Sequence, residues 1–150
     1  MRVVLQRVTG AQVSVANEMV SQIESGFLIL LGIEEADTAD DVTWLVGKIC
    51  KMRVFEDHDG KMNLSLLDID GEALVVSQFT LHASTKKGNR PSFIKAARPD
   101  HAEPLYRQFC EALSDQINKP IGRGKFGAMM EISLTNHGPV TITMDSRNRE

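Results

Sequence analysis

Three short segments of the chain combine residue types that could carry out chemistry. They are Ser77-Gln78-Phe79-Thr80-Leu81, Gly124-Lys-Phe-Gly-Ala-Met-Met130 and Asn136-His-Gly-Pro-Val-Thr141. In the first, two hydroxyls and an amide follow a buried apolar run, so they can line a polar site, and backbone N–H groups at the strand end can point at a ligand. The same pattern also fits a plain turn in which Ser77 and Thr80 satisfy backbone hydrogen bonds.

The other two segments each allow two interpretations. Glycines beside Phe126 and Met130 permit a close backbone approach, and these two side chains could cover a flat ring. From the residues alone, ordinary core packing is the better interpretation of this segment. Gly138-Pro139 can form a simple turn or a cis peptide bond, which costs an X–Pro bond only about 0.5–1 kcal/mol. A cis bond would aim two neighbouring carbonyls in nearly the same direction, with no side chain at Gly138 to block them.

Other catalytic patterns are absent from the sequence. The histidines are scattered without metal-ligand spacing and are expected on the surface or in loops: His58, His82, His101 and His137. No Gly-x-Ser-x-Gly elbow, phosphate-binding loop or dinucleotide fingerprint occurs. We therefore expect no metal and no cofactor.

Length and composition are those of one globular domain spanning residues 1–150, with 42% hydrophobic and 25% charged residues. Cys50 and Cys110 lie beside apolar residues in helical patterns, as expected of free buried thiols in a reducing compartment. The N-terminal apolar run is interrupted by polar residues, and the longest one, Phe27–Leu31, is too short to span a bilayer. These features predict a cytoplasmic protein without a membrane partner.

Positive charge is locally concentrated although the net charge is −3. Between Ser84 and Pro99 the chain has no acid and five basic residues, namely Lys86, Lys87, Arg90, Lys95 and Arg98. A second basic group follows and consists of Lys119, Arg123 and Lys125. Such segments can bind a polyanion while the rest of the acidic chain repels it. A solvated lysine-rich loop is the alternative interpretation.

Hydrophobic spacing predicts the strands that must position these segments. Strands are expected at 3–8 and 11–16, joined by a turn at Thr9-Gly10, and then at 19–24, 27–33, 53–55 and 74–79. The chain is expected to end in a hairpin, with arms Met129–Thr135 and Val140–Met144 connected through Asn136–Pro139.

Two helices are predicted from apolar residues at helical spacing. The first opens at Asp37-Thr38, and the second is expected to be capped by Asp100 with Glu103 in a capping box. The apolar face of the first helix is expected to consist of Val42, Leu45, Val46 and Ile49. That of the second is expected to consist of Ala102, Leu105, Phe109, Leu113 and Ile117. Together the elements predict an α+β fold, with a curved, mostly antiparallel sheet or barrel and two main helices packed outside.

Taken together, the three segments resemble the D-aminoacyl-tRNA deacylase (D-tyrosyl-tRNA deacylase) family. Ser-Gln-Phe-Thr-Leu at 77–81 and Asn-x-Gly-Pro-Val-Thr at 136–141 are similar to its two signature motifs. The opening residues 1–8, the loop 87–93 and Gly124-x-Phe-Gly-Ala-x-Met130 also match, in order and over essentially the whole chain.

The resemblance implies a homodimer with two active sites at the subunit interface. Gly138-Pro139, cis in this family, would insert into the partner's site, and Arg7 would help to hold it. The catalytic pocket would be lined by Ser77, Gln78, Phe79 and Thr80, with the backbone of Gln78 and Phe79 near the scissile ester. Phe126 and Met130 would receive the terminal adenosine of tRNA, and the basic segments would meet its phosphates through Lys86, Lys87 and Arg90.

The activity implied is hydrolysis of the ester between a D-amino acid, or glycine, and the 3′ end of tRNA, with rejection of L-amino acids. No Ser–His pair is available, which argues against an acyl-enzyme. Attack by water helped by the vicinal 2′-OH of tRNA is the favoured mechanism, and Thr80 as nucleophile is the lesser alternative. The alternatives for function are a related deacylase with a trans Gly-Pro that acts on small L-aminoacyl-tRNA, a non-catalytic nucleic-acid-binding dimer, and an unrelated esterase.

Overall fold

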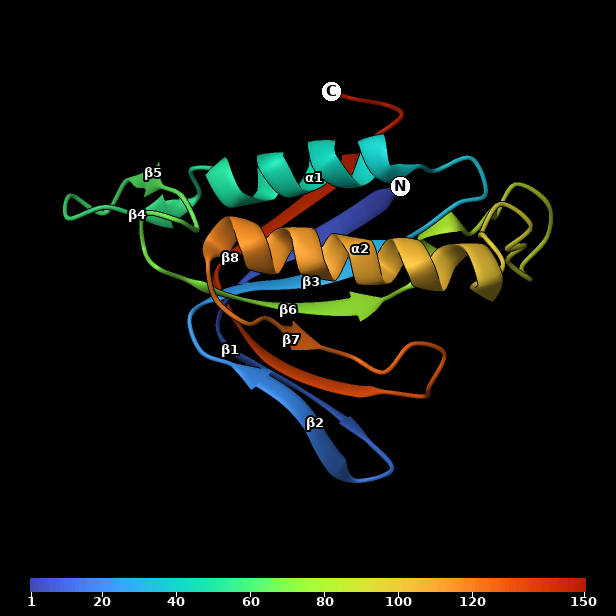
Figure 1. Ribbon diagram of the computed structural model, residues 1–150, viewed down its shortest axis with the longest axis horizontal. Helices are drawn as coiled ribbons and strands as arrows, with labels where there is room; N and C mark the ends of the chain where they lie inside the picture. Colours follow the sequence, from blue (N-terminus) through green and yellow to red (C-terminus); the bar gives the residue numbers. More distant parts are fainter.

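The computed structural model describes residues 1–150 and contains eight strands and two α-helices, with the helices side by side over one face of a curved sheet (Figure 1). The elements are β1 (Arg2–Val15), β2 (Glu18–Ile23), β3 (Gly26–Gly32), α1 (Ala39–Lys51), β4 (Phe55–Glu56), β5 (Met62–Leu64), β6 (Glu72–Ser77), the short 3₁₀ helix η1 (Phe79–His82), α2 (Pro99–Ile117), β7 (Gly122–Arg123) and β8 (Glu131–Asp145). The predicted α+β class is confirmed.

The main sheet runs in the order β2-β1-β3-β6-β7, and β8 pairs with the other edge of β1. β1 is antiparallel to β2, β3 and β8, whereas β3–β6 and β6–β7 are parallel pairs. β2 also approaches β6 and β7, so the sheet curls into a nearly closed barrel. A mostly antiparallel, barrel-like sheet was predicted, and this prediction is confirmed.

The predicted turn at Thr9-Gly10 is wrong, because β1 is one continuous strand. Its first half pairs with β3 and its second half with β2 along the same edge, while β8 follows the opposite edge. The pairing with β8 shifts between Val8 and Gly10. Thr9-Gly10 therefore marks an irregularity that increases the local bend of a long strand rather than a reversal of the chain.

The predicted hairpin at 129–144 is also wrong, because both of its expected arms belong to β8 and both pair with β1. Between the pairs Gln6↔Thr141 and Val8↔Asn136, β1 advances two residues while β8 advances five. Residues 137–140 are therefore a bulge extruded from the middle of a strand. The Gly-Pro pair occupies this bulge instead of a hairpin connection.

Both helices form where predicted, although the start of the second differs in detail. The first helix opens at Thr38 as predicted, and the structure adds a capping box that Thr38 forms with Asp41. The predicted capping of α2 by Asp100 is wrong. The helix begins at Pro99, whose fixed φ suits the first helical position, and Glu103 instead pairs with Arg107 at 2.6 Å.

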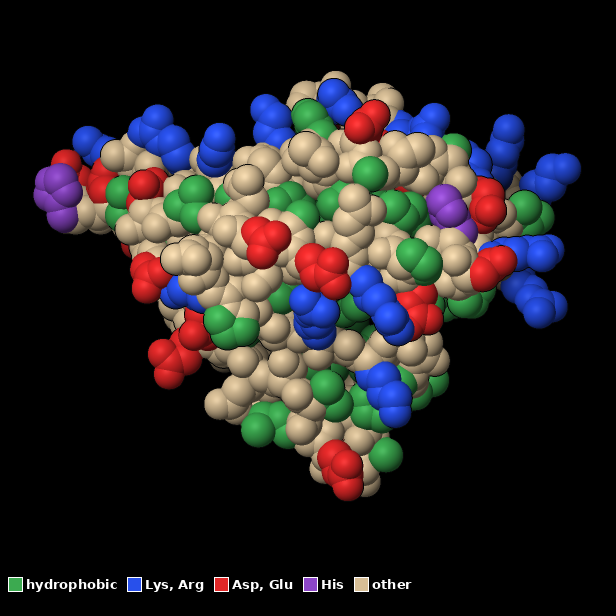
Figure 2. Space-filling model, viewed as in Figure 1, with side chains coloured by type: hydrophobic (Ala, Val, Ile, Leu, Met, Phe, Trp, Pro, Cys, Tyr) green, Lys and Arg blue, Asp and Glu red, His purple; other side chains and the backbone are tan.

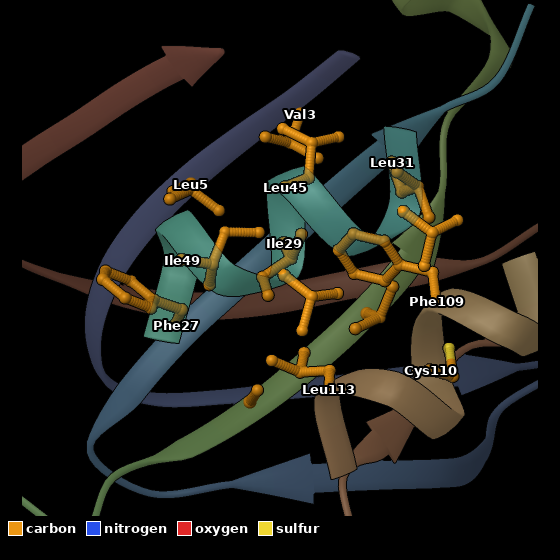
Figure 3. Close-up of a cluster of buried hydrophobic side chains, with 14 of the residues drawn as sticks. Val3, Leu5, Phe27, Ile29, Leu31, Leu45, Ile49, Phe109, Cys110 and Leu113 are labelled. Carbon is orange, nitrogen blue, oxygen red and sulfur yellow. The ribbon is translucent and has the colours of Figure 1, made fainter. Parts of the chain in front are cut away.

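The main core lies between the helices and the inner face of the sheet (Figure 3). Each fully buried large aliphatic or aromatic side chain there contributes about 1.5–3 kcal/mol; the fully buried members include Leu5, Phe27, Ile29, Leu31, Leu45, Ile49, Phe109 and Leu113. A second buried cluster fills the barrel half: Val8, Ala11, Val13, Ile23, Leu28, Leu74 and Val76. Cys50 and Cys110 are buried and free as predicted, and burial raises the pKa of both thiols to about 11.

Candidate functional site

The first candidate segment lies where β6 leaves the sheet. The strand ends at Ser77, two residues earlier than predicted, and the chain turns into η1. The backbone amide of Gln78 donates to the carbonyl of Leu31 at 2.8 Å, which anchors the turn to β3. The side-chain amide of Gln78 donates to Oγ1 of Thr80.

Two backbone donors of this turn are free. The first N–H groups of a helix have no partner within it, and neither the Phe79 nor the Thr80 amide donates a hydrogen bond within the chain. The next amides are engaged, because Leu81 donates to the Gln78 carbonyl at 3.2 Å and Ala83 donates to the Thr80 carbonyl at 3.0 Å. Two adjacent free amides are the kind of donors that stabilise an oxyanion.

A cavity of about 620 Å³ opens beside this turn. Its walls come from the end of β3, the end of β6, η1, the segment that leads into α2 and the segment that leads into β8. The lining residues are Leu31, Ile33, Val76, Ser77, Gln78, Phe79, Ala96, Ala97, Pro99, Ala102, Phe126, Gly127, Ala128, Met129, Met130 and Ile132. The structure thus brings Ser77, Gln78 and Phe79 together with Phe126 and Met130. Apolar walls with a few polar groups at one end are typical of a small-molecule site.

Phe126 packs against Tyr106 of α2, which is itself fixed to β6. Its ring lies 5.7 Å from the ring of Tyr106, whose hydroxyl donates to the Val75 carbonyl at 2.9 Å. Burial raises the pKa of the Tyr106 hydroxyl, so it remains a donor at neutral pH. A Cβ at Gly124 would lie 2.7 Å from the sulfur of Met130, so the absence of a side chain at Gly124 lets the Met130 side chain pack against this backbone.

Exposed apolar side chains surround the mouth of the cavity. Phe79 is 56% exposed and packs edge-to-face against Phe93 at 5.1 Å, while Ile94 and Met129 are almost fully exposed. Exposed apolar clusters of this kind mark binding surfaces. Phe93 and Ile94 were not predicted as site residues. The sequence signals for Phe93 were its aromatic side chain inside the basic loop and the match of residues 87–93 to the deacylase family.

The basic loop projects from the same end of the molecule (Figure 2). Lys86, Lys87 and Arg90 are exposed, and the base of the loop is closed by two backbone hydrogen bonds between Ser84 and Ser92 of 2.8 and 2.9 Å. In the second basic group Arg123 and Lys125 are exposed, whereas Lys119 is paired with Asp70 at 2.7 Å.

The Gly-Pro bulge has its own support. The Gly138-Pro139 peptide bond is cis, and residues 136–139 are exposed. Arg7, only 2% exposed, donates from Nε to the His137 carbonyl at 2.9 Å and from Nη1 to the Val54 carbonyl at 2.6 Å. Its Nη2 lies 3.3 Å from a carboxylate oxygen of Glu56. A buried guanidinium thus ties the bulge to the segment before β4.

Within one chain the bulge does not reach the cavity. Arg7 pairs with Phe27 on β3, whereas Ser77 pairs with Leu31, four residues further along the strand. This spacing corresponds to a separation on the order of 13 Å along the strand. The cavity lining accordingly includes neither the bulge nor Arg7.

The histidines contribute no catalytic set. His58 and His137 are exposed, and Nε2 of His101 lies 3.1 Å from the Asp37 carbonyl. The expected surface position of His82 is wrong, because this last residue of η1 is only 1% exposed. Neither of its ring nitrogens has a hydrogen-bond partner, and the nearest acidic oxygen, from Glu34, lies 3.9 Å from Nδ1. Across residues 1–150, no three His, Cys, Asp or Glu side chains converge in a way that could hold a metal ion. None of the helices is long and apolar enough to cross a membrane.

Comparisons with known proteins agree with this arrangement. A family model described as D-Tyr-tRNA(Tyr) deacylase matches residues 4–145. A D-aminoacyl-tRNA deacylase of Flavobacterium johnsoniae is 57% identical over 150 residues, which is 100% of both chains. A solved structure described as a c-Myc DNA unwinding element binding protein is 44% identical, with a TM-score of 0.92 over 97% of this chain and 98% of that one. Another, described as a probable eukaryotic D-amino acid tRNA deacylase, is 18% identical and shares the fold, with a TM-score of 0.82 over 95% of this chain and 97% of that one. With the family model spanning nearly all of its length, this chain belongs to the D-Tyr-tRNA(Tyr) deacylase family.

Proposed function

We propose that this chain hydrolyses D-aminoacyl-tRNA in the cytoplasm, releasing the D-amino acid and free tRNA, and that residues 1–150 act as one deacylase domain. The observation that carries the proposal is the pair of free amides at Phe79 and Thr80 beside a cavity of about 620 Å³. Pockets of roughly 300–1,000 Å³ suit small ligands. Membership of the deacylase family supports the same reaction.

The free amides would stabilise the negative charge that develops on the ester carbonyl as it is attacked. Because they belong to the backbone and point from a fixed turn, they need no reorganisation during the reaction. One such donor typically contributes about 10²–10³ in rate. An aminoacyl ester is already activated, so this stabilisation would be a large part of the catalysis.

Water is the proposed nucleophile, helped by the 2′-OH next to the ester. The Thr80 hydroxyl accepts a hydrogen bond from the side-chain amide of Gln78. This amide is a donor and cannot take a proton from the hydroxyl, so it cannot act as a base. Without a neighbouring base, a threonine hydroxyl is a weak nucleophile. The 2′-OH arrives already positioned, so the substrate supplies the proximity that the chain lacks.

The remaining substrate groups have proposed positions around the cavity. Phe126 and Met130 would cover the terminal adenosine, since both line the same cavity as the turn. Lys86, Lys87 and Arg90 would contact phosphates of the acceptor stem, since they project beside the cavity mouth and have no acidic partner.

Each site is proposed to be completed by a second copy of the chain. The bulge at 137–139 and the turn at 77–80 are exposed or partly exposed and lie at opposite ends of β3. A two-fold axis between these ends would carry the bulge of each subunit to the turn of the other, as an isologous dimer requires. The exposed apolar rim around Phe79 supports such a contact.

The bulge is proposed to select the chirality of the substrate. Arg7 holds the His137 carbonyl, which makes this backbone a rigid acceptor surface for the amino group at Cα. The same backbone would occupy the space that an L side chain needs, while a D side chain would point to solvent. Glycine has no side chain to exclude and would also be accepted.

The activity is tested with matched D- and L-tyrosyl-tRNA and purified wild-type protein. We expect release of D-tyrosine well above the spontaneous rate, with L-tyrosyl-tRNA left intact. Hydrolysis of small L-aminoacyl-tRNA without hydrolysis of D-aminoacyl-tRNA would favour the related trans Gly-Pro deacylase. No hydrolysis of either substrate would contradict the proposal.

The basic loop provides a further prediction. Lys86→Ala combined with Lys87→Ala is expected to raise KM for D-tyrosyl-tRNA and to flatten its salt dependence, because two phosphate contacts reduce the slope of log K against log salt by about 2. The measurement is KM between low and moderate salt. Lys61→Ala, at an exposed lysine of the β4–β5 turn, is the matched control. If KM and its salt slope are the same in both variants, the loop is not in the tRNA path.

A second candidate function is non-catalytic binding of nucleic acid. It is favoured by the 44% identity to the structure described as a DNA unwinding element binding protein, together with the exposed basic loop. Under this alternative, the wild-type protein would bind duplex or single-stranded DNA as tightly as charged tRNA and would leave the ester intact.

A further inference from the structure

The short helix η1 carries the two free amides, so its placement on the sheet decides where they point. We infer that Arg2 and Gly32 are positioning residues that seat η1, and that Asp145 braces Arg2. This inference rests on the proposed function for its catalytic consequence. The contacts that place η1 on the sheet can be measured without reference to the reaction.

Arg2 joins three parts of the molecule. Its Nη1 donates to the carbonyl of Leu81, inside η1, at 3.1 Å, and its Nε donates to a carboxylate oxygen of Asp145 at 2.8 Å. In the sheet, Arg2 pairs with Gly32 on β3 and with Asp145 on β8. The planar fork of arginine can reach both acceptors at once, which a single ammonium cannot.

Gly32 supplies the surface on which η1 rests. A Cβ at this position would lie 2.9 Å from the Gln78 carbonyl oxygen, 2.9 Å from Cβ of Leu81 and 3.2 Å from the ring of His82. Two of these neighbours are backbone or backbone-attached atoms and cannot rotate away. The turn therefore packs directly on the backbone of β3, and even one methyl group would push it outward.

Asp145 keeps Arg2 in place. Burial alone would raise the pKa of this carboxyl, but hydrogen bonds from the Arg147 amide and the Arg2 side chain hold the pKa below its usual value. The carboxylate is therefore ionised at neutral pH and gives Arg2 a charged partner. Hydrogen bonds that involve charged groups are about twice as strong as neutral ones.

A positioning role predicts loss of turnover rather than loss of binding. In Arg2→Met, which keeps length but removes both hydrogen bonds, we expect kcat for D-tyrosyl-tRNA to fall about 10-fold to 100-fold, because a shift of about 1 Å in catalytic groups can cost 10²-fold. KM should stay within about twofold, since Arg2 does not line the substrate cavity. Arg2→Lys, which restores one contact, should give an intermediate kcat.

Arg149→Met is the matched control. Arg149 lines the same surface pocket as Arg2 and stacks on Trp44 at 4.5 Å, but it makes no hydrogen bond to η1. It should retain the wild-type kcat and KM. Equal kcat in Arg2→Met and Arg149→Met would overturn the inference, as would a loss confined to KM.

Amide hydrogen exchange tests the seat without reference to activity. The Leu81 and Ala83 amides, which close η1, should exchange at least about tenfold faster in Arg2→Met than in the wild type, with no change in Arg149→Met. Gly32→Ala should accelerate the same amides. If the Leu81 and Ala83 amides exchange at the wild-type rate in Arg2→Met, Arg2 does not position η1, even if kcat falls. If the wild-type protein does not hydrolyse D-aminoacyl-tRNA, the proposed function fails, and the exchange result still decides whether Arg2 seats the turn.

Discussion

Gly138→Ala is expected to deacylate L-tyrosyl-tRNA, which the wild-type protein should spare. A Cβ at this position would lie 2.9 Å from Nη2 of Arg7 and 3.0–3.1 Å from Val140, and the backbone has φ +124°, which L side chains rarely adopt. The bulge must therefore shift or twist. Because displacement of about 1 Å can cost 10²-fold, we expect the ratio of D to L hydrolysis to fall about 10²-fold.

The measurement is initial rates of both substrates under identical conditions. Gly47→Ala is the matched control, since an added Cβ on this α1 residue meets nothing within 4 Å. It should retain the wild-type ratio. If Gly138→Ala discriminates as well as Gly47→Ala does, the bulge does not read the chirality of the substrate.

D-tyrosyl-tRNA ending in 2′-deoxyadenosine is expected to be hydrolysed about 10²–10⁴-fold more slowly than the normal substrate, the usual range for loss of a positioned proton-transfer group. The reason is that no histidine or carboxylate hydrogen-bonds to the Thr80 hydroxyl, so the chain itself supplies no base beside the turn. Binding should persist, because the adenine ring and phosphates are unchanged. The loss should therefore be in kcat.

Thr80→Val separates this mechanism from the alternative in which threonine is the nucleophile. Water attack helped by the 2′-OH predicts that Thr80→Val keeps kcat within about tenfold, since it loses only the contact with Gln78. If Thr80→Val has no activity while the wild-type protein hydrolyses the 2′-deoxyadenosine substrate at the normal rate, the result would instead support an acyl-threonine intermediate.

Local patterns in the sequence predicted the elements that depend on neighbouring residues. The first helix begins beside Thr38 as predicted, because its capping box and apolar spacing are encoded within a few residues. The prediction for the end of the chain was wrong, because Asn136–Pro139 has the composition of a turn, yet both flanking segments pair with β1, more than about 115 residues away in the sequence. Long-range packing determines which strands pair, and the local composition of a segment does not encode that pairing.

The candidate site shows the same division. The pocket was predicted to be lined by Ser77, Gln78, Phe79 and Thr80, with Phe126 and Met130 nearby. All of these except Thr80 line one cavity in the structure. Arg2 and Gly32 had no distinguishing signal, because an arginine and a glycine within strand patterns are ordinary. Their importance depends on η1 folding back onto β3, a contact between residues far apart in the sequence. His82 was misplaced for the same reason.

A crystal structure of the protein with a non-hydrolysable D-tyrosyl-adenosine analogue would test the central claim most directly, namely that two chains build each site. We expect the adenine against Phe126, the ester-equivalent carbonyl within hydrogen-bond distance of the Phe79 and Thr80 amides, and Gly138-Pro139 of the second chain within about 4 Å of the amino acid. An analogue bound with the bulges of both chains left in solvent would contradict it.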